Sequence, residues 1–564
     1  MQALCETLRQ KDKDNIFESF DIYRLFAFAG SLFLRYKEFI SAKGFKKFRR
    51  KTIVNSFVEK ITEINNVVNT WIWTDFGLYL LLAAGVIMTA VTGLFQIVHL
   101  PHWWKNTIMT VFKKDNTSTK KTDKKSISQF QALCTALAAT VGTGNIAGVA
   151  AAICIGGPGA VLWMWVAAFL GMMTNYSENV LGIYFRRKNK DGEWSGGAMY
   201  YLKDGLGRMK GMKIPASILA VLFAIFAILA SFGIGNMGQV NKITLNMESA
   251  FFSNVSWEVG GVNMINLIIG LVLLVIGALI ILGGLQRIAK VAELVVPFMA
   301  IAYIVFGLIA VGINYDLVIP AIKSIFTHAL GVKALAGGAT GAALKLVIVQ
   351  GCKRGVFSNE AGLGSSVMVH SASNVKEPVK QGMWGIFEVF FDTMIVCTMT
   401  ALIALTSGMI NLETGVPNAG VSDATLISDA FGLAYGQMGK WFIAIAMLLF
   451  AFTTVLGWSQ YGSKAVEYLF GVKAVKVYKV IFVLMIVSGA VMTSSLAWDI
   501  SDTFNGLMMI PNLIAVILLS PLVYKITRNY IHRKLQGKNE KPMYSFDPEI
   551  QAAAEASKSD DIIE

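Results

Sequence analysis

The chain has 564 residues, of which 55% are hydrophobic and 15% are charged, and its mean hydropathy is +0.56. This composition excludes an ordinary soluble domain and predicts an all-α polytopic membrane protein. The formal net charge of +14 does not indicate a nucleic-acid partner, because the basic residues gather in alternate loops between apolar segments, as the positive-inside rule describes.

Residues 1–65 are predicted to be a basic N-terminal extension. This segment contains thirteen Lys and Arg residues. Its apolar stretch, Ile22–Leu34, is short for a membrane span and carries Arg24. We therefore expect an amphipathic segment that lies at the membrane surface.

Apolar runs of about 20 residues, the length that crosses a bilayer as a helix, predict eleven membrane spans. They lie at about 74–98, 129–155, 158–185, 215–243, 262–283, 291–313, 335–370, 383–406, 440–462, 477–495 and 504–524. Together they define a transporter domain at 66–535, followed by a tail at 536–564. Without the first span, the other ten divide into a first repeat at about 129–313 and a second repeat at about 335–525.

The charges of the loops predict the orientation of the chain. Lys and Arg gather in four segments: 99–127, 186–213, 463–480 and the tail after 525. Two other loops carry acidic residues and no Lys or Arg: 244–261 and 407–439. The basic set is predicted to be cytoplasmic, with the C-terminus inside. Eleven spans then place the basic extension outside, so either a twelfth span lies near 20–40 or the extension is not part of the working fold.

Each repeat opens with a span that polar and glycine residues interrupt: Val141–Asn145 in the first and Gly351–Asn359 in the second. Backbone groups freed by a break cannot face lipid, so such breaks persist only where protein or a bound solute satisfies them. Two breaks at matching positions of two five-span halves are typical of a secondary transporter built as an inverted repeat. Close helix packing at glycine is the simpler alternative, but Thr, Asn and Ser beside the glycines favour a binding site.

The first break is predicted to hold a carboxylate. The N–H groups of Thr143, Gly144 and Asn145 are released there, and the half-helix that follows presents its positive N-terminal end. Gly142 and Gly144 lack the Cβ atoms that would keep a ligand away from the backbone. The alternative is a glycine kink that the Asn145 side chain fills.

Residues at the second break are predicted to bind an ammonium group. Unwound carbonyls from Gly351 to Phe357, including that of Gly355, would accept its hydrogen bonds, and Ser358 either contacts the ligand or caps the next half-helix. Lys353 and Arg354 are not assigned to the substrate; they reach the membrane surface or pair with a carboxylate such as Glu360 or Asp392.

Two further residues complete the predicted substrate site. Gln239 lies in an apolar span, where an amide without a partner is costly, so it bonds either the substrate or a neighbouring helix. Trp458 either walls the substrate chamber and keeps it small or packs within the bundle.

Several motifs in chain order resemble the alanine or glycine:cation symporter family. They are Thr140–Ala150, Gly156–Ala160 with Trp163 and Trp165, Gly196–Leu202, and Arg354–Gly364. The resemblance runs from about 65 to 535. It implies a leucine-transporter-like five-plus-five inverted repeat with one extra N-terminal transmembrane helix, and sodium-coupled import of alanine, glycine or similar small neutral amino acids across the inner (plasma) membrane.

The same resemblance implies a Na⁺ site made of neutral oxygens. Its ligands would be the carbonyls of Ala138, Val141 and Phe450 and the hydroxyls of Thr453 and Thr454. Threonine hydroxyls that bond back to their own helix are the alternative, and such bonds are common in membrane helices.

Ionisable residues inside predicted spans are functional candidates, because burying charge in a membrane is expensive. They are Glu178, Lys345, Glu388 and Asp392. Structural pairing is favoured for most of them, but Asp392 or Glu388 keeps a proton-coupled symporter open as an alternative, and a non-transporting amino acid sensor is another. A channel is not favoured, since two offset breaks are not a filter, and no histidine has the H-E-x-x-H context of a metalloenzyme.

Overall fold

The computed structural model describes residues 49–112, 119, 126–330, 340–492, 495–557, 559 and 561–563. The predicted interfacial segment and the alternative twelfth span near 20–40 lie outside the described residues. The chain divides into two units, Met1–Ile64 and Asn65–Glu564. The described part of the first unit belongs to helix α3 (Arg49–Thr70), and every feature below lies in the second unit.

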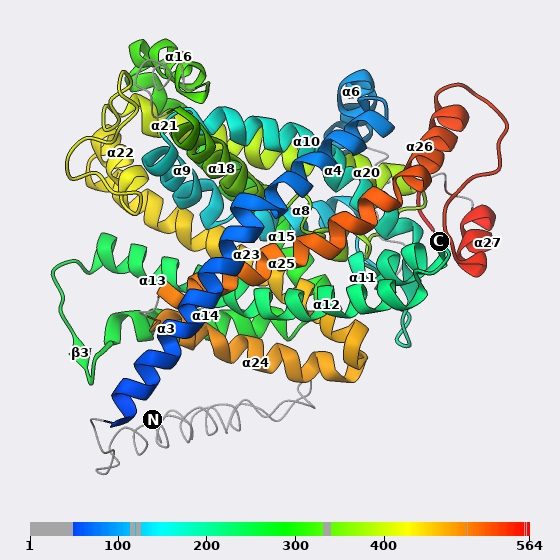
Figure 1. Ribbon diagram of the computed structural model, residues 1–564, viewed down its shortest axis with the longest axis horizontal. Helices are drawn as coiled ribbons and strands as arrows, with labels where there is room; N and C mark the ends of the chain where they lie inside the picture. Colours follow the sequence, from blue (N-terminus) through cyan, green and yellow to red (C-terminus); the bar gives the residue numbers. More distant parts are fainter. Residues whose placement is uncertain are drawn as a thin grey trace. The chain divides into compact units, whose positions relative to one another are not determined.

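A helix lies at each of the eleven predicted spans (Figure 1). They are η1–α4 (Trp71–Asp75, Gly77–Val91), α8–α9 (Gln129–Thr140, Val149–Gly156), α10 (Ala160–Tyr184), α12–α13 (Lys213–Phe232, Gly238–Phe251), α14 (Met264–Ile281), α15 (Leu285–Ile313), α18 (Thr340–Asn359), α20–α21 (Pro378–Val389, Thr398–Thr406), α23 (Gln437–Phe470), α24 (Val472–Ala490) and α25 (Ser495–Leu518). The predicted all-α membrane fold is confirmed.

Length and apolar composition alone identify seven membrane-crossing helices among the described residues, or eight if the bent pair α8–α9 counts as one span. The helices at three predicted spans, α10, α18 and α24, are outside that set. Helices α18 and α24 each contain three basic residues, which lowers their hydropathy. Helix α10 packs against both α18 and α20 within the bundle.

Shorter elements connect or interrupt these helices. The π-helical segments are η2 (Gly144–Gly148), η3 (Tyr201–Gly205), η5 (Gly233–Met237) and η7 (Phe390–Cys397), and the 3₁₀ segments are η4 (Leu206–Arg208) and η6 (Tyr315–Leu317). The shorter α-helices are α5 (Phe95–Val98), α6 (Leu100–Asn106), α7 (Ile108–Val111), α11 (Ala198–Tyr200), α16 (Val318–Ala329), α19 (Val367–His370), α22 (Leu426–Tyr435), α26 (Ser520–Lys534) and α27 (Pro548–Ala556). Two short antiparallel hairpins pair β1 (Arg187–Lys188) with β2 (Trp194–Ser195) and β3 (Glu258–Val259) with β4 (Val262–Asn263). Four π segments, η1, η2, η5 and η7, lie inside membrane spans, and such interruptions are frequent at functional sites.

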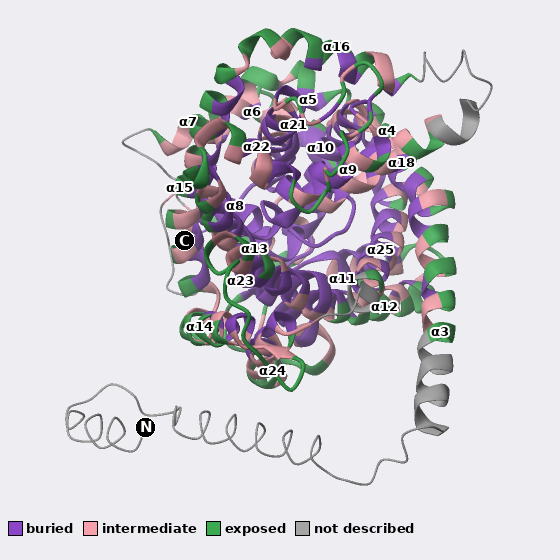
Figure 2. Ribbon diagram, turned by 90° about the vertical axis from the view of Figure 1, so that its left-hand side faces the viewer, coloured by how far each residue is buried: buried purple, intermediate pink, exposed green. Residues whose placement is uncertain are grey.

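Burial follows the pattern expected of a helical bundle in lipid (Figure 2). Large apolar side chains face outward along α15, where Leu294 is 75% exposed and Phe298 67% exposed. Polar and charged side chains such as Glu178, Glu388 and Asp392 are fully buried instead. Exposed apolar patches of this extent mark a surface that another apolar phase covers.

The first predicted break is confirmed. Helix α8 ends at Thr140, the backbone at Val141 leaves the helical conformation, and the chain resumes as η2 and α9 at an angle of 52° to α8. Glycine at positions 142 and 144 permits this turn without Cβ clashes.

The second predicted break, at Gly351–Asn359, is wrong. Helix α18 is continuous through these residues, and the chain leaves the helix only at Glu360 before the short α19. Gly351 instead allows close packing on α10, because an added Cβ would lie 2.3 Å from the Ala160 carbonyl oxygen. Ser358 and Asn359 therefore end a helix and do not cap the start of one.

The C-terminal tail folds back on the connection between α19 and α20. Arg533 donates to both carboxylate oxygens of Glu377, at 2.7 and 2.9 Å. Beyond α26, Ile562 forms an antiparallel bridge with Val375, and the N–H of Phe546 donates to the Tyr184 carbonyl. The tail is thus packed against both halves of the protein.

Candidate functional site

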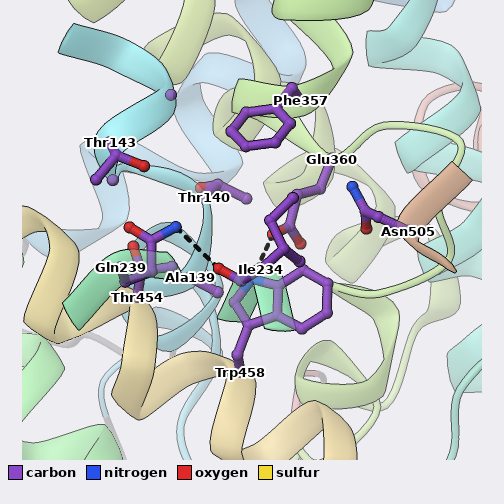
Figure 3. A pocket seen from close by; sticks show the side chains of 12 residues that line it. Ala139, Thr140, Thr143, Ile234, Gln239, Phe357, Glu360, Thr454, Trp458 and Asn505 are labelled. Atoms are coloured by element: carbon purple, nitrogen blue, oxygen red, sulfur yellow. Dashed lines mark hydrogen bonds between the residues drawn. The ribbon is translucent and has the colours of Figure 1, made fainter. Parts of the chain in front are cut away.

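A pocket lies where the first break, the end of α18 and helix α23 meet (Figure 3). Its lining residues are Ala139, Thr140, Gly142, Thr143, Gly144, Ile234, Gln239, Phe357, Glu360, Thr454, Trp458 and Asn505. It therefore brings together seven of the residues selected from the sequence: Gly142, Thr143, Gly144, Gln239, Phe357, Thr454 and Trp458.

The other predicted residues lie outside the pocket lining. They are Asn145, Gly355 and Ser358 of the substrate set, and Ala138, Val141, Phe450 and Thr453 of the Na⁺ set. Gly355 remains helical and packs on α10, since an added Cβ would lie 3.3 Å from Met164 Cα. The carbonyl that it was expected to offer is therefore not freed by a break.

The Asn145 side chain closes the first break from within. Its Oδ1 accepts from the Gly142 N–H at 2.9 Å, and its Nδ2 donates to Asp392 Oδ1 at 2.7 Å. This arrangement is the alternative considered for the first break, a glycine kink that the Asn145 side chain fills. The N–H groups of Thr143 and Gly144 remain available, because they begin the second half-helix and have no preceding turn to bond.

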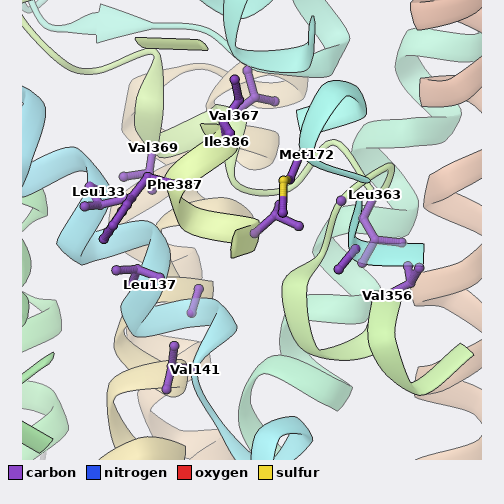
Figure 4. Packing of buried hydrophobic residues seen from close by; sticks show 14 of the residues in the cluster. Leu133, Leu137, Val141, Met172, Val356, Leu363, Val367, Val369, Ile386 and Phe387 are labelled. Carbon is purple, nitrogen blue, oxygen red and sulfur yellow. The ribbon is translucent and has the colours of Figure 1, made fainter. Parts of the chain in front are cut away.

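An apolar layer supports the first half-helix behind the pocket (Figure 4). Leu133 and Leu137 on α8 belong to the same buried cluster as Val369 on α19 and Phe387 on α20. Val141, at the break itself, is 0% exposed. The break is therefore held between packed helices and cannot open to lipid.

Asp392, in η7, links the first break to the end of α18. Besides Asn145 it accepts from Ser358 Oγ at 2.8 Å and from Thr393 Oγ1 at 2.9 Å, and Thr393 in turn accepts from Asn359 Nδ2 at 3.0 Å. Asp392 is 0% exposed, and no basic side chain of the described residues forms an ion pair with it. Ser358 thus faces Asp392 and not the pocket.

We expect Asp392→Asn to lower the stability of the purified protein by roughly 1–3 kcal/mol, because hydrogen bonds to a charged group are weakened. Thermal unfolding in detergent measures this loss. Asp429→Asn is the matched control, since its ion pair with Lys440 is 3.4 Å long and half exposed, and surface pairs contribute about 0–1 kcal/mol. Equal melting of the wild type and both variants would show that Asp392 does not hold the first break to the end of α18.

Thr454 lies directly against the first break. A Cβ added to Gly142 would be only 2.4 Å from Thr454 Oγ1. The hydroxyl donates to the Phe450 carbonyl at 3.0 Å, as the back-bonding alternative requires, but its lone pairs remain free to bind a cation. Thr453 also bonds back to its own helix, and its hydroxyl faces Met299 Sδ at 3.7 Å.

The first break also frees a carbonyl near Thr454. In a continuous helix the Gly142 N–H would donate to the Ala138 carbonyl, but here it donates to Asn145. A carbonyl without its helical donor, beside a threonine hydroxyl, is a set of neutral oxygens suited to a small hard cation such as Na⁺.

Three buried polar atoms in the pocket lining have no hydrogen-bond partner within the described structure: Thr140 Oγ1, Gln239 Oε1 and Asn505 Oδ1. Gln239 uses only its Nε2, which donates to the Ile234 carbonyl at 3.1 Å. Because buried polar groups are nearly always satisfied, these atoms indicate a site for a ligand or water.

Sequence reasoning did not assign five of the lining residues: Ala139, Thr140, Ile234, Glu360 and Asn505. For Glu360 a signal existed, since an ionisable group inside an apolar segment is a functional candidate. Asn505 lies in α25, far from either break in sequence, and only the fold brings it to the pocket.

The remaining ionisable candidates form structural pairs away from the pocket. Glu178 accepts from Asn512 at 2.5 Å, and Glu388 pairs with His370 at 2.9 Å. Lys345 forms a half-exposed pair with Asp75. Lys353 pairs with a carboxylate, one of the two alternatives considered for it, but that carboxylate is Asp502 at 2.8 Å and not Glu360 or Asp392.

Comparison with known proteins gives matches along most of the chain. Residues 58–544 match the sodium:alanine symporter family. The sodium/alanine symporter AgcS of Methanococcus maripaludis is 42% identical over 475 residues, which cover 84% of this chain and 98% of AgcS. The amino-acid carrier protein AlsT of Bacillus subtilis is 36% identical, with 84% and 92% covered. The solved structure of MhsT in complex with L-phenylalanine matches with a TM-score of 0.48 and 12% identity, covering 72% of this chain and 99% of MhsT.

Proposed function

Because the chain belongs to the sodium:alanine symporter family, we propose that it imports alanine or glycine together with Na⁺ by alternating access. The coarser activity, cation-coupled amino acid symport in a membrane, follows from family membership. The choice of Na⁺, the preference for small substrates and the inward direction, with the C-terminus in the cytoplasm, are the proposed part.

The pocket at the first break is the observation that carries this proposal. Free N–H groups at Thr143 and Gly144, at the positive end of a half-helix, suit a substrate carboxylate. Trp458, Phe357 and Ile234 wall the pocket with apolar surface, which limits the side chain that fits. The neutral oxygens around Thr454 and Ala138 suit Na⁺.

Uptake into vesicles tests the proposal. Purified protein in liposomes should accumulate labelled alanine when an inward Na⁺ gradient is imposed, and should not when K⁺ replaces Na⁺. Accumulation driven by an inward proton gradient without Na⁺ would favour the proton-coupled alternative, with Asp392 as its candidate carboxylate. Alanine binding without accumulation under any gradient would favour a sensor.

We expect Trp458→Ala to enlarge the pocket, so that valine or leucine enters and alanine binds more weakly. The Trp458 ring packs on Gly235, where an added Cβ would lie 2.5 Å from it, and its Nε1 donates to Glu360 Oε1. One methylene in an apolar pocket changes selectivity by roughly 10- to 200-fold. Competition of labelled alanine by unlabelled amino acids of increasing size measures the change.

Trp441→Ala is the matched control for this experiment. Trp441 lies on the same helix, is 40% exposed and donates to the Ala250 carbonyl, so its loss should not alter selectivity. If Trp458→Ala keeps the wild-type order of substrates, Trp458 is a packing residue and not a wall of the chamber.

A further inference from the structure

Glu360 has an uncommon backbone conformation that places it at the pocket. It follows the last residue of α18, and its φ of +56° is in the left-handed region, which non-glycine residues seldom adopt. Gly362 and Gly364, with φ of +90° and +71°, continue the turn. Conformations of this kind are costly and cluster at functional sites.

The Glu360 carboxylate is buried among neutral donors. It is 3% exposed; its Oε1 accepts from Trp458 Nε1 at 2.9 Å and its Oε2 from Ser365 Oγ at 2.5 Å (Figure 3 shows the first bond). No Lys, Arg or His of the described residues forms an ion pair with it. A buried carboxylate with only neutral donors around it would gain strongly from a cation that enters the pocket.

The continuity of α18 through residues 351–359 makes this charge important. The carbonyls of residues 351–356 stay in α18 and cannot receive an ammonium group. The Phe357 carbonyl has lost its helical donor, since the Ala361 N–H donates to Asn359 Oδ1 at 3.0 Å. Glu360 and this carbonyl, with the unpartnered oxygens of Gln239 and Asn505, give the pocket an excess of acceptors.

The two ends of a zwitterion thus have separate partners in the pocket. The N–H groups at Thr143 and Gly144 donate, whereas the residues from α18, α13 and α25 accept. We propose that Glu360 binds the α-ammonium group of the substrate and restricts the site to solutes with a free ammonium group, an inference that rests on the proposed function. A bound ammonium supplies such a cation, and a solute without one leaves the carboxylate unpaired.

Glu360→Gln tests the role of this charge. Glutamine keeps the size of the side chain and an oxygen that accepts from Trp458, but it removes the negative charge. We expect alanine affinity at saturating Na⁺ to fall about 10- to 100-fold, the equivalent of one hydrogen bond to a charged group. Binding of labelled alanine to the purified protein measures it, and Glu360→Asp, which keeps the charge, should recover part of the loss.

Glu178→Gln is the matched control. Glu178 is also a fully buried carboxylate held by a neutral donor, Asn512, but it does not line the pocket. Its substitution should leave alanine affinity unchanged. Wild-type affinity in a folded Glu360→Gln protein would overturn the inference. A loss that higher Na⁺ fully restores would overturn it too, because Glu360 would then bind Na⁺.

A second experiment requires no substitution. Lactate replaces the ammonium of alanine with a hydroxyl, so it should not compete measurably for the wild-type site, since sites with buried polar partners reject analogues that leave them unpaired. Competition by lactate as strong as that by unlabelled alanine would overturn the inference. Failure of the wild-type protein to bind alanine would instead contradict the proposed function, so the two failures are distinct.

Discussion

Gly142→Ala is expected to abolish Na⁺-dependent alanine uptake while the protein still folds and inserts. The added methyl group would lie 2.4 Å from Thr454 Oγ1 and 3.4 Å from Thr454 Cβ. It must therefore push the first break away from α23, at the point where the carbonyls and hydroxyls for Na⁺ meet. Binding of both Na⁺ and alanine depends on this geometry. We therefore expect uptake to fall below about 1% of the wild-type rate, which corresponds to roughly 3 kcal/mol of activation free energy.

Gly148→Ala is the control for Gly142→Ala. Gly148 is the last residue of η2, directly before α9, and an added Cβ there would meet nothing within 4 Å. Both variants exchange glycine for alanine in the same broken helix, but only the methyl group at position 142 would meet Thr454. Uptake near wild type in Gly142→Ala would show that α23 can yield and that the close approach is not required.

Gly144→Ala should have a smaller effect than Gly142→Ala. Its added Cβ would lie 3.2 Å from Phe357 Cδ1 and from Ser358 Cα, contacts that a small shift relieves. We still expect weaker alanine binding, since the shift moves the N–H groups assigned to the carboxylate.

The spans and the first break could be predicted because their signals are local. An apolar run of about 20 residues has few other uses, and Gly142, Gly144 and the polar residues between them stand inside such a run. The same local signal misplaced the second break. Gly351 and Gly355 look identical in sequence to break residues, but the fold uses them to let α18 approach α10.

Side-chain direction could not be read from the sequence. Asn145 and Ser358 were expected at the substrate, but both turn toward Asp392, and Asp392 is more than 30 residues from either. Asn505 reaches the pocket from α25 for the same reason, because tertiary packing alone decides which helices meet there. Thr143 and Gly144, which were selected because they lie at the first break, do line the pocket.

Thr454→Val should raise the Na⁺ concentration for half-maximal uptake by at least about 10-fold, the equivalent of one lost interaction of about 1.4 kcal/mol. Valine has nearly the shape of threonine but no ligand oxygen. Alanine uptake should approach the wild-type maximum when Na⁺ is raised enough, because the substrate contacts at Thr143 and Gly144 are kept. The measurement is initial uptake in vesicles over a series of Na⁺ concentrations.

Thr406→Val is the control that separates the loss of Na⁺ coordination from a loss of helix stability. Thr406 is also a buried threonine of a membrane helix, and its Oγ1 donates to the Leu402 carbonyl at 2.8 Å, as Thr454 Oγ1 does to Phe450 at 3.0 Å. Both substitutions remove one back-bonding hydroxyl, but only Thr454 touches the first break. If both variants keep the wild-type Na⁺ dependence, the Thr454 hydroxyl only bonds its own helix and is not a Na⁺ ligand. If only Thr454→Val loses Na⁺ affinity, the hydroxyl is a ligand, because loss of a hydrogen bond within the helix would affect both variants alike.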